Sequence, residues 1–472
     1  MKKTALYHYV TTLILLLALS SGAAEGVVLK DQFDSLIDSA NPNLNAGIYV
    51  ESLKTREPLY QRNLHRYYIP ASALKIVTSL AALAELGPNY TYTTNLYLNE
   101  SKKVKGGYDL FLEFDGDPTF TTDQLARLFK QIQKKYPIIK LGNLIVDTYA
   151  MGRIPPLNPG VLLEDVETCE TTPVSAAILD GNFYDCVLVP AQRMGKPAVL
   201  KSKSGLKPPY PIENNTKTVA QGKNTWRSYG FVGGTMRIEG DIAKNKPIEL
   251  PTRSLKRYLK ERIESALKQS GTNIQGAIAW KPVPAHLTPV AKHTSARLES
   301  ILIDASQRSD NLIFDAVFLK VTTRADVSPV KTWKEAGKRI KRIIHKNYGV
   351  DLTHSVIADG SGLSRYNLMT PAQFSSLLVA AYTNPDIGQE FFKTLPVNGG
   401  RGTLATRMTE ENMKEKVHAK TGSMSGVSSL VGDVTTESND TLVIVFLMND
   451  FVGSSLKYRN LQDDLCRVLV KQ

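Results

Sequence analysis

Cysteine is scarce in this chain, with three residues among 472, and this scarcity excludes a fold built on many disulfides. Apolar runs of the roughly 18–20 residues needed to span a bilayer are missing. The His-Glu-x-x-His and Cys-x-x-Cys patterns of common metal sites are absent too, so the sequence predicts no metal and no cofactor. Acidic residues number 45 against 58 Lys and Arg, and the resulting formal charge of +13 favours an anionic partner without naming it.

The first residues predict export. Lys2 and Lys3 precede an apolar stretch over 10–19, and five small residues follow over 20–24. This order is typical of a secretory signal peptide, here residues 1–24, and predicts export across the inner membrane. An oxidising compartment would allow a disulfide between Cys169 and Cys186, but two buried free thiols fit the sequence equally well. An exported chain without an aromatic-basic module is not expected to bind nucleic acid.

The remaining chain predicts an α+β fold with an insertion. Strands separated by a polar turn are expected over 48–60, and a helix that opens near residue 72 should end at Gly87-Pro88. Short β-rich runs then alternate with clusters of Gly, Pro and Asn. The Lys-rich stretch 201–223 is expected to be an exposed loop. Further helices are predicted over 255–269, 311–322 and 455–470, and strands over 427–435 and 441–448. We therefore expect a catalytic domain from 25–90 and 286–472, interrupted by a β-rich region over 91–285 with two nested domains.

Ser72-Ala-Leu-Lys75 is the first pattern that could carry chemistry. Residues three apart share a helix face, so the Lys75 amine can lie beside the Ser72 hydroxyl and accept its proton if burial removes the charge of the lysine. The Ser-x-x-Lys spacing also occurs at four other serines, but only Ser72 follows closely on a proline and opens a long apolar helix. Taken alone, this pattern favours a helix cap with a surface lysine.

Two more patterns lie far along the chain. Ser309-Asp-Asn311 precedes an apolar helix, and both Ser309 and Asn311 are also ordinary capping residues. Lys420-Thr-Gly-Ser423 lies between strand patterns, where Lys420 supplies a positive charge, Thr421 a hydroxyl and Gly422 room for a substrate backbone. A simple turn explains the Lys420-Thr-Gly422 pattern about as well.

The joint order of the three patterns resembles that of serine β-lactamases and penicillin-binding proteins. The chain is most similar to the D-alanyl-D-alanine carboxypeptidase/endopeptidase family of low-molecular-mass class C penicillin-binding proteins. The resemblance covers nearly the whole mature chain and rests on these landmarks: Ile69-Pro-Ala-Ser72, Gly87-Pro-Asn-Tyr90, Gly116-Asp-Pro-Thr119, Pro173-Val-Ser-Ala176, Asp359-Gly-Ser-Gly-Leu-Ser-Arg365, Leu395-Pro-Val and Ala419-Lys-Thr-Gly422.

This resemblance implies a penicillin-binding/β-lactamase-like transpeptidase domain, an antiparallel sheet with helices, that carries inserted β-rich domains. Ser72 would attack the carbonyl between two D-alanines with Lys75 as base, and the backbone N–H groups of Ser72 and Ser423 would form the oxyanion hole. The implied catalytic residues are Ser72, Lys75, Ser309, Asn311 and Lys420, and the implied substrate-binding residues are Thr421, Gly422, Ser423 and Arg365.

The implied partners are peptidoglycan stem peptides as substrates and β-lactam antibiotics as covalent inhibitors. The balance between carboxypeptidase and endopeptidase activity stays open at this point, as do peripheral membrane association and the oligomeric state. Two alternatives compete with this function: a β-lactamase, which the long gap between Ser72 and Ser309 disfavours, and a non-catalytic wall-binding protein, which the three intact motifs disfavour.

Overall fold

The computed structural model describes residues 28–104, 106–222, 224–323 and 330–472. The signal peptide expected over residues 1–24 lies outside the described residues. The described chain begins in a helix that continues through residue 40. Within these ranges, no helix combines the length and the apolar character needed to cross a membrane.

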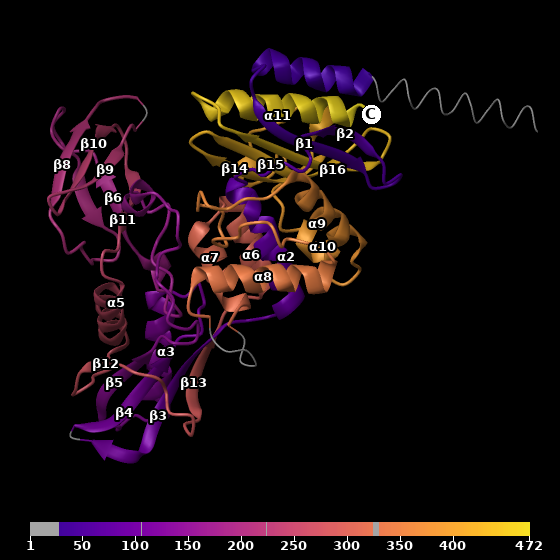
Figure 1. The fold of residues 1–472 in the computed structure, drawn as a ribbon. Helices are drawn as coiled ribbons and strands as arrows, with labels where there is room; N and C mark the ends of the chain where they lie inside the picture. The colour runs from indigo at the N-terminus through magenta and orange to yellow at the C-terminus, as the bar shows by residue number, and fades with distance from the viewer. Residues whose placement is uncertain (1–27, 105, 223, 324–329) are drawn as a thin grey trace, which may run out of the picture.

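A five-stranded antiparallel sheet joins strands from residues 45–62 with strands from residues 417–449 (Figure 1). Its strands run in the order β14-β15-β16-β1-β2, and every neighbouring pair is antiparallel. Both faces of this sheet are covered: the 28–40 helix and α11 lie on one side, and the helical layer lies on the other. The elements are β1 (Asn45–Ser52), β2 (Pro58–Arg62), β14 (Val417–Met424), β15 (Val427–Thr435), β16 (Thr441–Asn449) and α11 (Ser455–Val470).

The central strand β16 explains why the sheet is covered on both sides. Its sequence is almost entirely apolar, and successive side chains of a strand point to opposite faces. Val443, Val445 and Leu447 join the hydrophobic core under the helical layer. Leu442, Ile444, Phe446 and Met448 alternate with them and join the core formed with α11 and the N-terminal helix. The strand therefore ties two separate cores into one unit.

The helical layer holds the residues of the first two sequence motifs. A short 3-10 helix, η1 (Ala71–Leu74), leads directly into α2 (Lys75–Leu86), whose first nine residues are buried. Gly87 ends α2 with a φ of +82°, a backbone conformation that glycine adopts without strain, and Pro88 follows. The other helices of this layer are α6 (Leu298–Arg308), α7 (Asn311–Val321), α8 (Trp333–Tyr348), α9 (Pro371–Thr383) and α10 (Gly388–Phe392).

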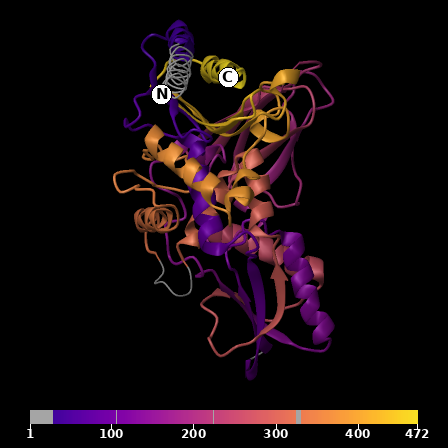
Figure 2. The same ribbon diagram turned by 90° about the vertical axis from the view of Figure 1, so that its right-hand side faces the viewer.

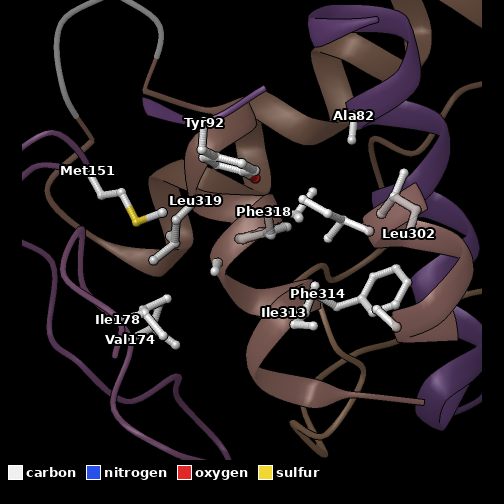
Figure 3. Close-up of a cluster of buried hydrophobic side chains, with 14 of the residues drawn as sticks. Ala82, Tyr92, Met151, Val174, Ile178, Leu302, Ile313, Phe314, Phe318 and Leu319 are labelled. Carbon is white, nitrogen blue, oxygen red and sulfur yellow. The ribbon is translucent and has the colours of Figure 1, made fainter. Parts of the chain in front are cut away.

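Helix α7 joins the helical layer to the inserted region, as Figure 3 shows. Phe314 and Phe318 point toward Leu302 of α6 and Ala82 of α2, whereas Leu319 lies on the side of Met151. The side chains drawn there are buried and belong to one hydrophobic cluster. Packing on both sides fixes the helix firmly, and with it the Ser309–Asn311 segment at its beginning.

The inserted region contains three further sheets and lies beside the helical layer (Figure 1). One is five-stranded, in the order β12-β5-β4-β3-β13, and two are three-stranded, β11-β6-β7 and β8-β10-β9. The chain builds most of the first sheet, then both small ones, and then returns to complete the first. The elements are β3 (Thr93–Val104), β4 (Gly107–Glu113), α3 (Thr122–Lys135), β5 (Leu141–Asp147), α4 (Leu163–Glu167), β6 (Phe183–Val189), β7 (Val199–Ser202), β8 (Ile212–Thr218), β9 (Arg227–Val232), β10 (Thr235–Ile242), β11 (Lys246–Pro251), α5 (Leu255–Ser270), β12 (Ile278–Trp280) and β13 (Pro289–Thr294).

The expected α+β fold, with an antiparallel sheet, helices and a β-rich insertion, is confirmed. Two local expectations are wrong. The stretch 201–223 is not all loop, because β8 lies within it and pairs with β10. The insertion does not end at 285, since β13 still pairs with β3. Both strands contain several polar residues, so their sequences show no apolar pattern that predicts a strand. Among the described residues, Cys169, Cys186 and Cys466 are free thiols.

Candidate active site

Ser72 and Lys75 lie one helical turn apart where η1 meets α2. Lys75 Nζ is 2.8 Å from Ser72 Oγ, and the lysine side chain is 1% exposed. The residue before the serine, Ala71, has a φ of +48°, in the left-handed region that non-glycine residues rarely adopt. Strain of this kind persists where the surrounding structure holds it, and it is concentrated at functional sites.

The Lys75 amine has two further hydrogen-bond partners. Nζ donates to Asn311 Oδ1 at 2.7 Å and to the Ser361 carbonyl oxygen at 2.7 Å. A neutral amine has two N–H bonds and one lone pair, and these two acceptors occupy both N–H bonds. The lone pair is then left for the hydroxyl of Ser72. Burial lowers the pKa of Lys75 to about 8, although Asp315 and other nearby carboxylates oppose this shift.

Asp315, which the sequence analysis did not identify, holds the loop that supplies one of these acceptors. Its Oδ1 accepts the backbone N–H of Gly360 at 2.9 Å and that of Ser361 at 2.8 Å. The carboxyl is 1% exposed, and burial together with the Asp359 charge raises its pKa well above the usual range. The Ser361 carbonyl that receives Lys75 is thus fixed through Asp315. Asp315 lies one helical turn after Asn311 on α7, a spacing that could have drawn attention to it.

Replacing Asp315 with alanine should therefore disturb Lys75 without touching it. Loss of both backbone hydrogen bonds should slow acylation by penicillin roughly 10- to 100-fold, since small displacements of a reacting group cost that much. Asp315→Asn is the matched control: its amide oxygen can still accept both N–H groups, so it should stay close to wild type. The acylation rate is measured for both variants at a temperature where each is folded. Equal acylation by the alanine variant and wild type would contradict this role.

Ser309 and Lys420 meet on the opposite side of the site. Lys420 Nζ donates to Ser309 Oγ at 3.0 Å and to the Thr421 carbonyl oxygen at 3.0 Å. Ser309 ends α6 with a φ of +56°. The side chain that caps α7 is neither Ser309 nor Asn311, as the capping explanation would require, but Asp310, which accepts the Ile313 N–H at 3.0 Å. The side chains of Ser309 and Asn311 therefore do not cap α7.

The charge of Lys420 depends on its surroundings. Its side chain is 1% exposed, and burial, with the nearby Lys75, holds its pKa well below the usual 10.5. The sequence pattern assigns Lys420 a positive charge, and burial opposes that charge. A bound carboxylate would favour the protonated amine and raise the pKa again.

Strand β14 is the edge strand of the main sheet and presents backbone groups outward. The Ala419 N–H donates to Pro396 O at 2.9 Å, so it points away from β15. N–H directions alternate along a strand. The N–H groups of Thr421 and Ser423 therefore also point outward, where an extended peptide could pair with them.

Gly422 allows this strand to approach the helix that carries Ser72. A Cβ at this position would lie 2.6 Å from Pro70 O and 3.0 Å from Ser72 N. The third motif thus lies directly against the first, even though they are far apart in sequence. Arg365 lies at the rim, where its Nη1 donates to Ser425 O, just beyond the end of β14, at 3.2 Å.

A cavity of about 490 Å³ opens beside Asn311 toward the inserted region. Glu170 and Asp310 line it, as do Pro118 and Thr119 from one of the sequence landmarks. The Asn311 amide donates from Nδ2 to the Glu170 carbonyl oxygen at 2.8 Å. Burial raises the pKa of the Glu170 carboxyl. The insertion therefore contributes one wall of the cavity next to Asn311.

The comparison with known families is decided by a model that spans almost the whole chain. Residues 29–472 match the model of the D-Ala-D-Ala carboxypeptidase 3 (S13) family. The chain belongs to this family. The family assignment and the serine-type D-Ala-D-Ala carboxypeptidase activity expected from the sequence are thereby confirmed. An S13 peptidase of this kind acts outside the cytoplasm, on the cell wall.

Relatives agree with the S13 assignment. The chain is 27% identical over 424 residues to the D-alanyl-D-alanine carboxypeptidase DacB of Haemophilus influenzae, covering 88% of this chain and 87% of that protein. It is 29% identical over 433 residues to the D-alanyl-D-alanine carboxypeptidase of Actinomadura sp. (strain R39), covering 86% of this chain and 78% of that protein.

The crystal structure of penicillin binding protein 4 (dacB) from Haemophilus influenzae has the same fold. It superimposes with a TM-score of 0.77 at 23% sequence identity, over 93% of this chain and 99% of that one. A structure of the same protein complexed with a β-lactam gives a TM-score of 0.75. The predatory endopeptidase Bd3459 from Bdellovibrio bacteriovorus gives 0.51 at 16% identity, over 90% of this chain and 91% of that one.

Proposed function

We propose that this S13 peptidase releases the terminal D-alanine of peptidoglycan stem peptides through an acyl-enzyme on Ser72. Its hydroxyl oxygen attacks the carbonyl carbon between the two D-alanines while its proton passes to Lys75. The C–N bond to the terminal D-alanine then breaks and leaves an ester on Ser72, which water hydrolyses. The observation that carries this proposal is the 2.8 Å contact between Lys75 Nζ and Ser72 Oγ, with Asn311 and Ser361 occupying the other two directions of the amine. A base within hydrogen-bond reach of its nucleophile is the arrangement that acyl transfer requires.

The oxyanion that forms during attack needs donors aimed at it. The outward N–H of Ser423, together with the Ser72 N–H, supplies such donors, and backbone amides need no rearrangement during the reaction. Support comes from the register of β14 and from the close approach of Gly422 to Ser72. We assign the oxyanion hole to these two groups.

The departing D-alanine needs a proton, and its carboxylate needs a partner. Ser309 and Lys420, 3.0 Å apart, can pass a proton to the leaving nitrogen. Lys420 and Thr421 can receive the terminal carboxylate, whose negative charge would favour the protonated form of Lys420. Asn311 would bind the substrate amide through Nδ2, replacing the Glu170 carbonyl that it contacts here. Arg365 at the rim would contact the peptide side chain.

We further propose that β-lactams acylate Ser72 and that the protein is periplasmic. A β-lactam is similar to the D-Ala-D-Ala end of the substrate, and the Haemophilus influenzae protein of the same fold has been crystallised with one. The periplasmic location rests on the sequence of the first 24 residues.

Cleavage of D-alanyl cross-links is a second candidate activity. Such a bond has a peptide, and not a free alanine, on its leaving side, so it needs space beyond the catalytic groups. The cavity of about 490 Å³ next to Asn311 offers space of this kind. Digestion of purified cross-linked and uncross-linked muropeptides, followed by separation of the products, tests both activities. Release of D-alanine alone would leave a carboxypeptidase only, and release of neither product would contradict the proposed function.

A further inference from the structure

A basic groove runs along α8, away from the catalytic groups. Two cavities of about 760 Å³ and 410 Å³ adjoin there and share Lys338 and Lys341 in their walls. We call this feature the α8 groove and define it by Lys334, Lys338, Lys341, Arg342, His345 and Tyr366. Figure 1 shows α8 across the front of the helical layer, and Figure 2 shows the same orange helix almost end-on at the edge of the molecule.

The sequence of α8 separates its charges from its core contacts. Ala336, Ile340 and Ile344 are buried, whereas Lys334, Lys338 and Arg342 recur every four residues and are exposed. Across the described residues, no carboxylate forms an ion pair with Lys338 or Arg342. Positive charge along one face of a packed helix attracts anions.

Among the described residues that line the α8 groove, Asp351 is the only acidic one. Its Oδ1 accepts the Thr353 N–H at 2.7 Å. Lys341 is held in place, since Nζ donates to Thr353 O at 2.9 Å and to Ser355 O at 3.0 Å. The groove therefore has a fixed, basic wall.

Tyr366, at one end of the groove, is next in sequence to Arg365 at the rim of the candidate active site. Tyr366 lines this end and is 62% exposed, and its neighbour in sequence, Arg365, contacts Ser425 beside β14. From Lys334 to His345 the helix extends about 17 Å at 1.5 Å per residue. An extended anionic chain lying along α8 could thus continue to the edge strand where the substrate binds.

We propose that the α8 groove binds a carboxylate-bearing stretch of the polymeric substrate and holds cross-linked peptidoglycan against the catalytic cleft. This inference rests on the proposed function, because it names the polymer as the substrate. Stem peptides carry free carboxylates and match the charge of the groove. A membrane surface fits less well, because the basic residues line a concavity and not a protruding face. A small peptide would reach the active site without using the groove.

The experiment compares two double variants with equal changes of charge. Lys338→Glu/Arg342→Glu reverses the charge of the groove, and Lys134→Glu/Lys256→Glu reverses exposed charges on α3 and α5, outside the groove. Each protein is assayed for binding to isolated peptidoglycan over a range of salt concentrations, for binding to anionic lipid vesicles, and for D-alanine release from a small D-Ala-D-Ala peptide. The groove variant should bind peptidoglycan about tenfold or more weakly than the wild type, and this binding should lose most of its salt dependence. Its activity on the small peptide should stay within about twofold of the wild-type activity, because no catalytic contact is changed.

Several results would overturn the inference. Equal losses of peptidoglycan binding in the two double variants would show an effect of total charge, and unchanged binding in the groove variant would remove the groove from polymer recognition. A loss of vesicle binding without a loss of polymer binding would assign the groove to a membrane. Failure of the unaltered protein to release D-alanine from the small peptide would instead contradict the proposed function, so the two failures are distinguishable.

Discussion

Ser72→Ala is expected to form no covalent adduct with labelled penicillin and to lose D-alanine release by a factor on the order of 10⁴–10⁶, the range seen when a catalytic serine acting with its base is removed. The reason is chemical. The alanine methyl group has no oxygen with which to attack, so the amine of Lys75, the Ser423 N–H and the Ser309–Lys420 pair have no acyl-enzyme on which to act. Gel detection of the labelled protein gives a direct result that does not depend on turnover.

The control should remove a serine from the same helix without removing the nucleophile. Ser79 lies in α2, four residues beyond Lys75, and is 3% exposed. Ser79→Ala should therefore keep the adduct and test whether a change in this buried helix is harmful in itself. An adduct that persists in Ser72→Ala would show that another residue is acylated and would refute the mechanism.

The parts of the fold that the sequence predicts best are those buried on two sides. β16 occurs close to where its pattern places it, because a strand covered on both faces can be apolar almost throughout. By contrast, β8 has the sequence IENNTKT and pairs with β10 in a small sheet. The backbone makes the hydrogen bonds that pair this strand, and its side-chain sequence does not indicate them.

The site divides in the same way. Ser72, Lys75, Ser309 and Lys420 are found by their motifs, because the chemistry requires particular side chains at short spacing. The Ser361 carbonyl and the edge N–H groups of β14 belong to the backbone, and any residue could supply them. Their positions follow from the strand register and from the hold of Asp315 on the 359–361 loop. Local patterns do not encode such contacts, which join segments far apart in the chain.

The rate of acylation should rise with pH through about 8, the pKa of Lys75, and level off above it. The sign follows from the role of the amine: only the neutral form can accept the Ser72 proton, and it accumulates as pH increases past the pKa. Burial lowers this pKa from 10.5 to about 8, which increases the neutral fraction at pH 7 about 300-fold, since each pKa unit is a factor of ten. Penicillin acylation rates measured from pH 6 to pH 10 give the profile.

The substitution Lys75→Arg removes the base at this position but keeps its positive charge. A guanidinium stays protonated over this whole range, so it retains the charge near Asn311 but has no lone pair for the Ser72 proton. We expect acylation to fall by about 10²–10⁴-fold, the usual contribution of a positioned base, and the inflection near pH 8 to disappear. An arginine variant that keeps the inflection would assign it to another group, of which Lys420 is the first to examine, because burial lowers its pKa as well. A wild-type rate that falls as pH rises through 8 would contradict Lys75 as the base.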